Sequence, residues 1–453
     1  MPERYTDGPS MRRPSGDLWH HSDFLKLWTG QSISEFGSQV SGLAIPWLAA
    51  KELHASPLAF SLLGVLAFLP FILFALPAGV WVDRLRRRPI LIVGDASRAV
   101  LLAWIPLAWA LGILTMWQLF VIEFVVGIFT VLFDVAYQSY LPSLIDRDQL
   151  IEGNSKLQTT AAAAGTAGPG LAGALIAAVT APYAILVDAA SFVVSTAFMI
   201  PIRRRETLPE RAQGAPKPKM LPELREGVAY VVRHPYLKWI AACTGSSNFF
   251  SSISMAIGLL YMARTLQMSS LAVGVVFGGF GIGSILGALT TPRIQRAVGV
   301  GGAIWMPVMV SSVALLAWPL APASFPLPVL LIGTFLVGFG AIAYNISQVS
   351  LRQAITPERL QGRMNASMRW IVWGTMPLGT LVGGAIATAY SLRTALWVGA
   401  IGSLFTWLPV FLSSVRTIQD MPEPLVEATP AEAALAGGIV DPATLPGTAV
   451  ADA

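Results

Sequence analysis

The chain has 453 residues and a formal net charge of +5, and it is 54% hydrophobic but only 12% charged. About 25% of the residues of an ordinary soluble protein are charged. The composition therefore excludes a typical water-soluble domain and predicts an integral membrane protein. The single cysteine, Cys243, excludes an internal disulfide.

Apolar stretches long enough to cross the roughly 30 Å hydrocarbon core as helices recur along the chain. The first begins near Phe24, after a polar segment that lacks the cleavage site of a signal peptide, so we interpret it as a retained span. Punctuation by glycine, proline and charge predicts twelve spans, at 24–50, 57–82, 89–112, 115–139, 157–179, 182–202, 237–262, 270–291, 301–321, 327–350, 366–389 and 392–415.

Lysine and arginine are distributed unevenly over the loops between these spans. Most of the 30 fall in loops on one side, whereas only Lys51, Arg264 and Arg393 fall in loops on the other. Because positive charge marks cytoplasmic loops, both termini are predicted to be cytoplasmic, with the chain in the cell or inner membrane. This distribution explains the net charge without a nucleic-acid partner.

A long polar segment divides the spans into two groups of six. Parallel halves with a substrate site between them are a transporter architecture. A weak repeat at one constant offset supports two halves and pairs Leu141, Ile145, Leu150, Leu171, Gly173, Ile176 and Ala177 with Leu351, Ile355, Leu360, Leu381, Gly383, Ile386 and Ala387. The predicted organisation is an N-terminal tail (1–23), a six-helix bundle (24–202), a cytoplasmic linker (203–236), a second six-helix bundle (237–415) and an acidic disordered tail (416–453).

The loop between the second and third spans carries a dense motif. It reads Gly79-Val-Trp-Val-Asp83-Arg84-Leu-Arg86-Arg87-Arg88. This resembles the cytoplasmic signature of the major facilitator superfamily, although Arg86 stands where many members have glycine. The resemblance implies that Asp83 and Arg84 help to gate the cytoplasmic side. The alternative is that the arginines only enforce topology.

Two further motifs resemble the efflux branch that contains enterobactin exporters and macrolide-efflux proteins, namely Ser34-Glu-Phe-Gly37 in the first span and Asp188-Ala-Ala-Ser191-Phe192 in the sixth. In the fifth span, Gly168-Pro169-Gly170-Leu-Ala-Gly173 resembles an antiporter signature that is associated with exporters, with Ala172 in place of one glycine. The resemblance implies the all-α major facilitator fold and favours export. The alternative for the fifth span is generic close packing through small residues.

Several carboxylates are predicted to lie within the membrane, where ionisable groups are costly and are functional candidates. Glu123 and Asp134 point in nearly the same direction on the fourth span, about 16 Å apart along its axis. Glu35 and Gln39 belong to a polar stripe on the first span. Because burial disfavours the charged form of a carboxylate, these groups could couple transport to protons. The alternative is a permanent structural pairing, for example with Arg98.

The second half has no carboxylate in mid-span but has uncharged polar residues at helical spacing. Asn248 lies in the seventh span, and Asn345 and Gln348 lie in the tenth. They could hydrogen-bond a substrate, or they could bond across helices for about 0.6 kcal/mol each.

No Gly-Lys-Ser/Thr phosphate loop, His/Cys metal-ligand spacing or catalytic constellation occurs. We therefore expect no cofactor, no bound metal and no enzymatic activity. The sequence predicts a monomeric secondary transporter in the lipid bilayer that exports a small amphipathic compound, such as a drug, macrolide or siderophore, in exchange for protons. Uptake or facilitated diffusion, and a non-transporting scaffold or sensor, remain alternatives.

Overall fold

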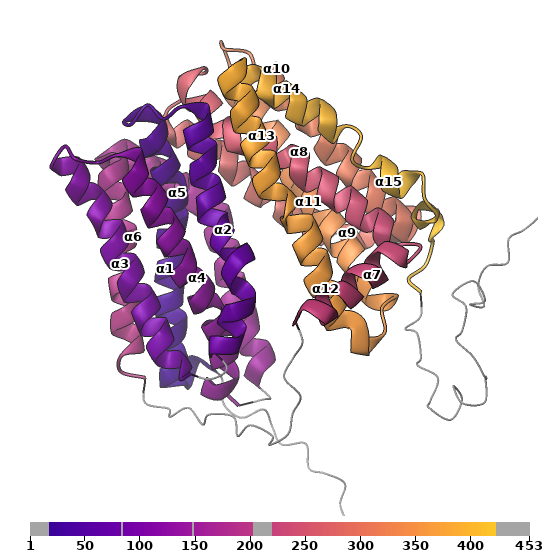
Figure 1. Cartoon of the computed structure of the whole chain (residues 1–453), viewed down its shortest axis with the longest axis horizontal. Helices are drawn as coiled ribbons and strands as arrows, with labels where there is room; N and C mark the ends of the chain where they lie inside the picture. Colours follow the sequence, from indigo (N-terminus) through magenta and orange to yellow (C-terminus); the bar gives the residue numbers. More distant parts are fainter. Residues whose placement is uncertain (1–17, 83–84, 147–148, 203–219, 423–453) are drawn as a thin grey trace, which may run out of the picture.

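A computed structural model describes residues 18–82, 85–146, 149–202 and 220–422. Throughout these residues the regular secondary structure is helical. The helices form two groups that lie side by side in Figure 1, the first in indigo and purple and the second in red to yellow.

The first group is led by the short 3₁₀ helix η1 (Leu18–His20) and holds six long helices. Helix α1 packs on α6 and α5, α2 packs on α4, and α3 packs on α6 and α4. A reciprocal capping box between Thr115 and Gln118 begins α4. The bounds are α1 (Ser22–Lys51), α2 (Pro57–Val82), α3 (Arg87–Ala110), α4 (Met116–Leu144), α5 (Leu150–Val179) and α6 (Ala181–Met199).

The second group begins with an amphipathic helix, α7, that lies within the predicted linker and packs on α12. Helix α9 packs extensively on α11, and α8 packs on α13 and α14. The bounds are α7 (Met220–Arg233), α8 (Leu237–Arg264), α9 (Ser270–Ala314), α10 (Ala317–Leu320), α11 (Pro326–Ala354), α12 (Glu358–Trp373), α13 (Thr375–Ala389), α14 (Leu392–Ser403), α15 (Leu408–Phe411) and the 3₁₀ helix η3 (Ser414–Thr417).

Helix α9 is interrupted at Gly299, so it contains two consecutive predicted spans. Gly299 has φ 75°, a left-handed conformation that glycine adopts without strain. The interruption frees backbone groups, and Val300 and Gly301 donate hydrogen bonds to the carbonyl oxygens of Gln419 (3.0 Å) and Ile418 (2.8 Å). We expected disorder from residue 416 onward, but residues 418 and 419 are held against α9 because they accept these bonds.

The last two predicted spans are also divided. The span at 366–389 is shared between α12 and α13, which meet at Gly374, and the span at 392–415 is shared between α14 and α15. Nine stretches of the described residues are long and apolar enough to span a membrane. The uncounted α1 and α8 are long enough but more polar, and one of the nine stretches, 270–320, contains the break at Gly299. The helices thus accommodate the twelve predicted spans.

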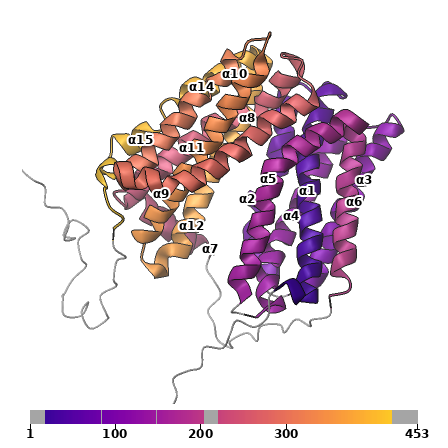
Figure 2. The ribbon, with the colours of Figure 1, turned by 180° about the vertical axis from the view of Figure 1, so that it is seen from behind.

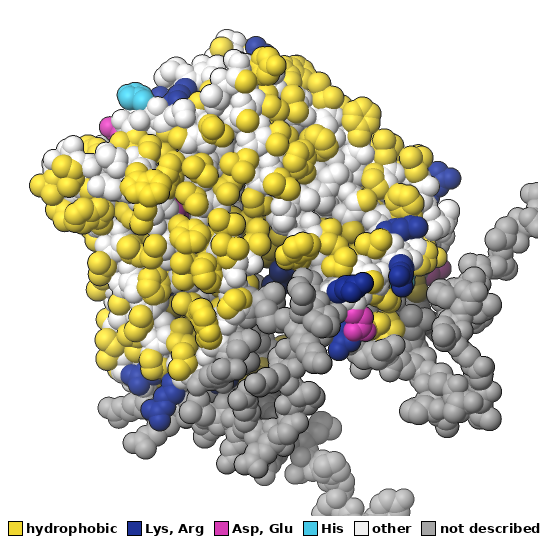
Figure 3. Space-filling model, viewed as in Figure 1, with side chains coloured by type: hydrophobic (Ala, Val, Ile, Leu, Met, Phe, Trp, Pro, Cys, Tyr) yellow, Lys and Arg dark blue, Asp and Glu magenta, His cyan; other side chains and the backbone are white. Residues whose placement is uncertain are grey.

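The two helix groups meet at one end and diverge toward the other, as the front and back views both show (Figures 1 and 2). The contacts between them join α5 to α9 and α2 to α13, with fewer between α1 and α8. Figure 3 shows hydrophobic side chains over the flanks of both groups and most of the visible Lys and Arg near the lower edge, where the groups diverge. This distribution is typical of a helical bundle embedded in a bilayer.

Candidate functional site

A cavity of about 680 Å³ lies between the two helix groups. Both groups line it: α1, α2, α4 and α5 on one side, and α8, α9, α10, α11 and α13 on the other. Cavities of this size accommodate drug-sized ligands. The cavity is therefore the candidate substrate site.

The first helix group supplies the only ionisable group in the described lining. Glu123 of α4 lines the cavity, together with Gln39 of α1, Ser61 of α2 and Pro169 of α5. Glu123 also interacts electrostatically with Asp188 of α6. A carboxylate in an apolar cavity can exchange a proton or pair with a cation.

Two hydroxyl groups in the lining have unsatisfied hydrogen-bonding capacity. The Oγ of Ser61 and the Oγ1 of Thr334 are buried and have no hydrogen-bond partner. These two residues could not be recognised from the sequence, because an isolated serine or threonine in an apolar helix ordinarily bonds to its own backbone.

The remaining walls are mostly apolar. Helix α2 contributes Phe60 and Phe68, α9 contributes Phe277 and Phe280, and Trp318 of α10 closes another wall. Two methionines, Met255 and Met376, lie on the side of the second helix group. Aromatic and thioether side chains make a surface that adapts to apolar ligands of different shape.

Glu35 and Asp134 do not line this cavity. They surround Arg98 of α3, inside the first helix group, where the guanidinium interacts electrostatically with Glu35, Asp95, Asp134 and Asp188. Glu123 and Asp134 share a face of α4, as the helical period predicts, but they occupy different environments along its length.

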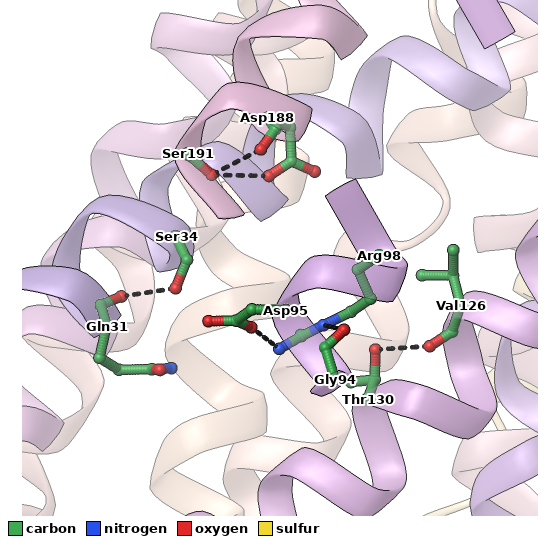
Figure 4. A network of polar contacts seen from close by, with 9 residues as sticks. All are labelled: Gln31, Ser34, Gly94, Asp95, Arg98, Val126, Thr130, Asp188 and Ser191. Atoms are coloured by element: carbon green, nitrogen blue, oxygen red, sulfur yellow. Dashed lines mark hydrogen bonds and ion pairs between the residues drawn. The ribbon is translucent and has the colours of Figure 1, made fainter. Parts of the chain in front are cut away.

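Arg98 is held firmly at the centre of this polar network. It forms an ion pair with Asp95, and Nε approaches the carbonyl oxygen of Gly94 at 3.4 Å. The guanidinium lies over the rings of Phe133 (4.4 Å) and Phe192 (4.3 Å). Figure 4 shows the contacts of Arg98 with Asp95 and Gly94 on α3, together with neighbouring polar contacts on α1, α4 and α6. Four carboxylates around one arginine leave a surplus of negative charge when all are ionised.

The two efflux-branch motifs meet beside this network. Gly37 of α1 lies so close to α6 that an added Cβ would overlap Ser191 and Asp188. The Oγ of Ser191 donates to the backbone carbonyl of Asp188 (2.8 Å; Figure 4). Glycine in one motif and a small polar residue in the other are explained by this close approach.

The antiporter-like motif lies where the helix groups meet. Gly168 packs on the side chain of Gln39, and Gly173 approaches the Cα of Gly274. The hydroxyl of Ser270 donates to the carbonyl oxygen of Gly173 (3.0 Å). Small residues therefore bring α5 and α9 into backbone contact across the interface.

The polar candidates of the second helix group have protein partners. The Nδ2 of Asn248 donates to the carbonyl oxygen of Val372 (2.8 Å). The Nε2 of Gln348 donates to Asn345 (3.3 Å), and its Oε1 accepts from Arg352 (3.0 Å). None of the three lines the cavity; Ser251 and Ser252 do.

The cytoplasmic signature is described only in part. A Cβ added at Gly79 would meet no atom of the described residues within 4 Å, and Arg88 donates to the carbonyl oxygen of Met199 (3.2 Å). Arg87 begins α3. Asp83 and Arg84 lie outside the described residues. Within the described ranges, no group of three or more His, Cys, Asp or Glu could hold a metal ion.

Comparison with known proteins identifies the family to which this architecture belongs. The family described as transmembrane secretion effector matches residues 18–435. The chain belongs to this family. This family is an efflux-type branch of the major facilitator transporters. The resemblance that the sequence motifs suggested is therefore confirmed.

Efflux proteins are similar over almost the whole chain. The multidrug efflux pump Tap of Mycolicibacterium fortuitum is 26% identical over 406 residues, which are 86% of this chain and 95% of that protein. The enterobactin exporter EntS of Citrobacter koseri is 22% identical over 87% of this chain and 88% of its own. Macrolide efflux protein A of Streptococcus pyogenes is 21% identical over 88% and 97%.

A solved structure shares the fold. The nucleoside transporter NupG superposes with a TM-score of 0.69 at 12% identity, over 87% of this chain and 99% of its own. The predicted fold class, an all-α membrane protein of the major facilitator type, is therefore confirmed.

Proposed function

We propose that this transporter exports small amphipathic compounds in exchange for protons, by alternating access of the cavity between its two helix groups. The observation that carries this proposal is the cavity itself, bounded by both groups and lined by Glu123. Relative rocking of two halves exposes such a cavity first to one side of the membrane and then to the other.

The surplus of carboxylates supports proton coupling. Glu35, Asp95, Asp134 and Asp188 share one arginine, and Glu123 extends this acidic region to the cavity wall. Keeping several negative charges in a bundle interior is costly, and protons are the simplest ligands that remove the cost. Binding and release of protons at this region would accompany the change in access.

Export is favoured by the relatives, which are named as a multidrug efflux pump, an enterobactin exporter and a macrolide efflux protein. The backbone contact of Gly173 with α9 gives the antiporter-like motif a position where it can influence opening. Uptake or facilitated diffusion, and a scaffold that does not transport, are the competing functions.

We further propose that both termini lie in the cytoplasm, in the inner membrane of a bacterium, with two six-helix bundles at 24–202 and 237–415. The gathering of Lys and Arg where the helix groups diverge supports this orientation (Figure 3). The described cavity then opens toward the cytoplasm. A monomer suffices, because one chain supplies both walls of the cavity.

The test uses purified protein in liposomes that contain a pH-sensitive dye. Test compounds are added under an imposed pH gradient, and wild type is compared with Glu35→Gln and Glu123→Gln. Compound-dependent proton flux in the exchange direction, lost in either variant, supports the proposal. Compound movement without proton flux, unchanged in both variants, would establish facilitated diffusion and assign both carboxylates to structural roles.

A further inference from the structure

We infer that the cavity selects amphipathic cations over anions, with the cationic centre held at Glu123 and the apolar body against the apolar walls that both helix groups supply. This inference rests on the proposed function, since it names the substrate class of the same cavity. It also separates the compounds considered at the outset, because it favours basic compounds and disfavours an anionic siderophore.

The charge of the lining carries the first step. Within the described lining, Glu123 is the only ionisable residue, and no lysine, arginine or histidine is present. Behind Glu123 lies Asp188, followed by the acidic residues around Arg98. An anion in this cavity would meet negative charge with no positive partner, whereas a cation would be attracted.

The distribution of side chains carries the second step. Apolar side chains line the cavity from both helix groups, including Phe60 and Phe68 of α2 and Phe277 and Phe280 of α9, whereas Glu123 of α4 is the one ionisable residue of the described lining. A ligand that fills the cavity is therefore expected to place its charge at Glu123 and its apolar part against these walls. Aromatic faces also attract organic cations.

Tetraphenylphosphonium and tetraphenylborate test the charge selection, because they have nearly the same size and shape but opposite charge. Binding of each ion to the protein in nanodiscs is measured by calorimetry, and empty nanodiscs give the background from membrane partitioning. We expect the cation to bind at least about tenfold more tightly than the anion once the background is subtracted, a difference of about 1.4 kcal/mol.

Variants locate the selectivity. Glu123→Gln should abolish most of the preference, Glu123→Asp should keep it, and Glu52→Gln, which removes an exposed acid at the end of α1, should leave it unchanged. Equal affinities in the wild type, or a preference for the borate, would overturn the inference. So would an unchanged preference in Glu123→Gln. The wild-type comparison remains decisive even if that variant does not fold.

Binding and transport answer separate questions. Cation selectivity without proton flux would retain this inference and reject proton-coupled export. Proton-coupled transport of neutral or anionic compounds alone would retain the proposed function and reject the inference.

Discussion

Arg264 at the end of α8 donates two hydrogen bonds to the carbonyl oxygen of Ala50 near the end of α1, from Nε at 3.0 Å and from Nη2 at 2.8 Å. The two residues belong to different helix groups. Carbonyls at the end of a helix lack partners within it, and a cation is favourable there. The pair therefore fastens the groups together at the end where they meet.

Replacing Arg264 with methionine should loosen this end of the molecule. The variant retains most of the apolar stem but cannot donate to Ala50. Hydrogen bonds to charged groups contribute about 1.5–3 kcal/mol when buried, and Arg264 is partly exposed, so we expect the population open at this end to rise about fivefold. Spin labels at Leu111 and Phe325, two exposed positions at the joined end, should report a longer distance.

Arg393→Met is the matched control. The Nε of Arg393 donates to the carbonyl oxygen of Pro319 (2.9 Å), but both residues belong to the second helix group. The control should leave the label distances unchanged. If both variants behave like the wild type, Arg264 does not stabilise the closed end.

Gly37→Ala should destabilise the first helix group. The new Cβ would overlap the Cβ of Ser191 at 2.8 Å and Oδ1 of Asp188 at 2.6 Å, so α1 and α6 must separate. Overpacking of this kind costs about 1–3 kcal/mol. Thermal melting of the purified protein in detergent should show a lower transition temperature.

Gly42→Ala, on the same helix, provides the comparison. An added Cβ at Gly42 meets nothing within 4 Å, and alanine favours helix more than glycine does. Its transition temperature should equal or exceed that of the wild type. Similar losses in both variants would mean that α1 tolerates no side chain for reasons other than its contact with α6.

The helices could be predicted from the sequence because hydropathy and punctuation are local properties. The break at Gly299 falls between two predicted spans, whereas the break at Gly374 divides the predicted span 366–389. The apolar stretches themselves lie where the sequence predicts them. The helix α7 within the linker was missed because its residues are polar enough to resemble a loop. Its apolar face becomes meaningful only when α12 is beside it.

The candidate site could be predicted only in part. The sequence shows which residues share a face of a helix, but it does not show what packs against each of them along the length of the helix. Glu123 and Asp134 share a face of α4, but only Glu123 reaches the cavity, whereas Asp134 lies beside Arg98. Asn248 has an amide that could hydrogen-bond a substrate, but this amide already donates to the carbonyl oxygen of Val372 in α12. Ser61 and Thr334 could not be identified, since their lack of partners depends on packing between distant segments.

Acidification should destabilise the junction between α7 and α8 through His234. The Nδ1 of His234 accepts from the backbone nitrogens of Tyr236 (3.2 Å) and Leu237 (3.4 Å), which only an unprotonated nitrogen can do. Burial lowers the pKa of His234 from 6.5 to about 4 in the folded protein. Between these values the unfolded chain binds the proton more readily, so the contribution is complete above pH 6.5 and is lost as the pH falls toward 4.

Thermal melting between pH 7.5 and 4.5 measures this contribution. His234→Asn keeps an acceptor near the start of α8 but cannot titrate, so its transition temperature should fall less steeply with acidification. The difference should correspond to about 1–2 kcal/mol, after allowance for the partial exposure of the imidazole. His54→Asn, at an exposed loop position after α1, should retain the wild-type slope. If His234→Asn and wild type lose stability in parallel, the acid sensitivity arises elsewhere in the chain.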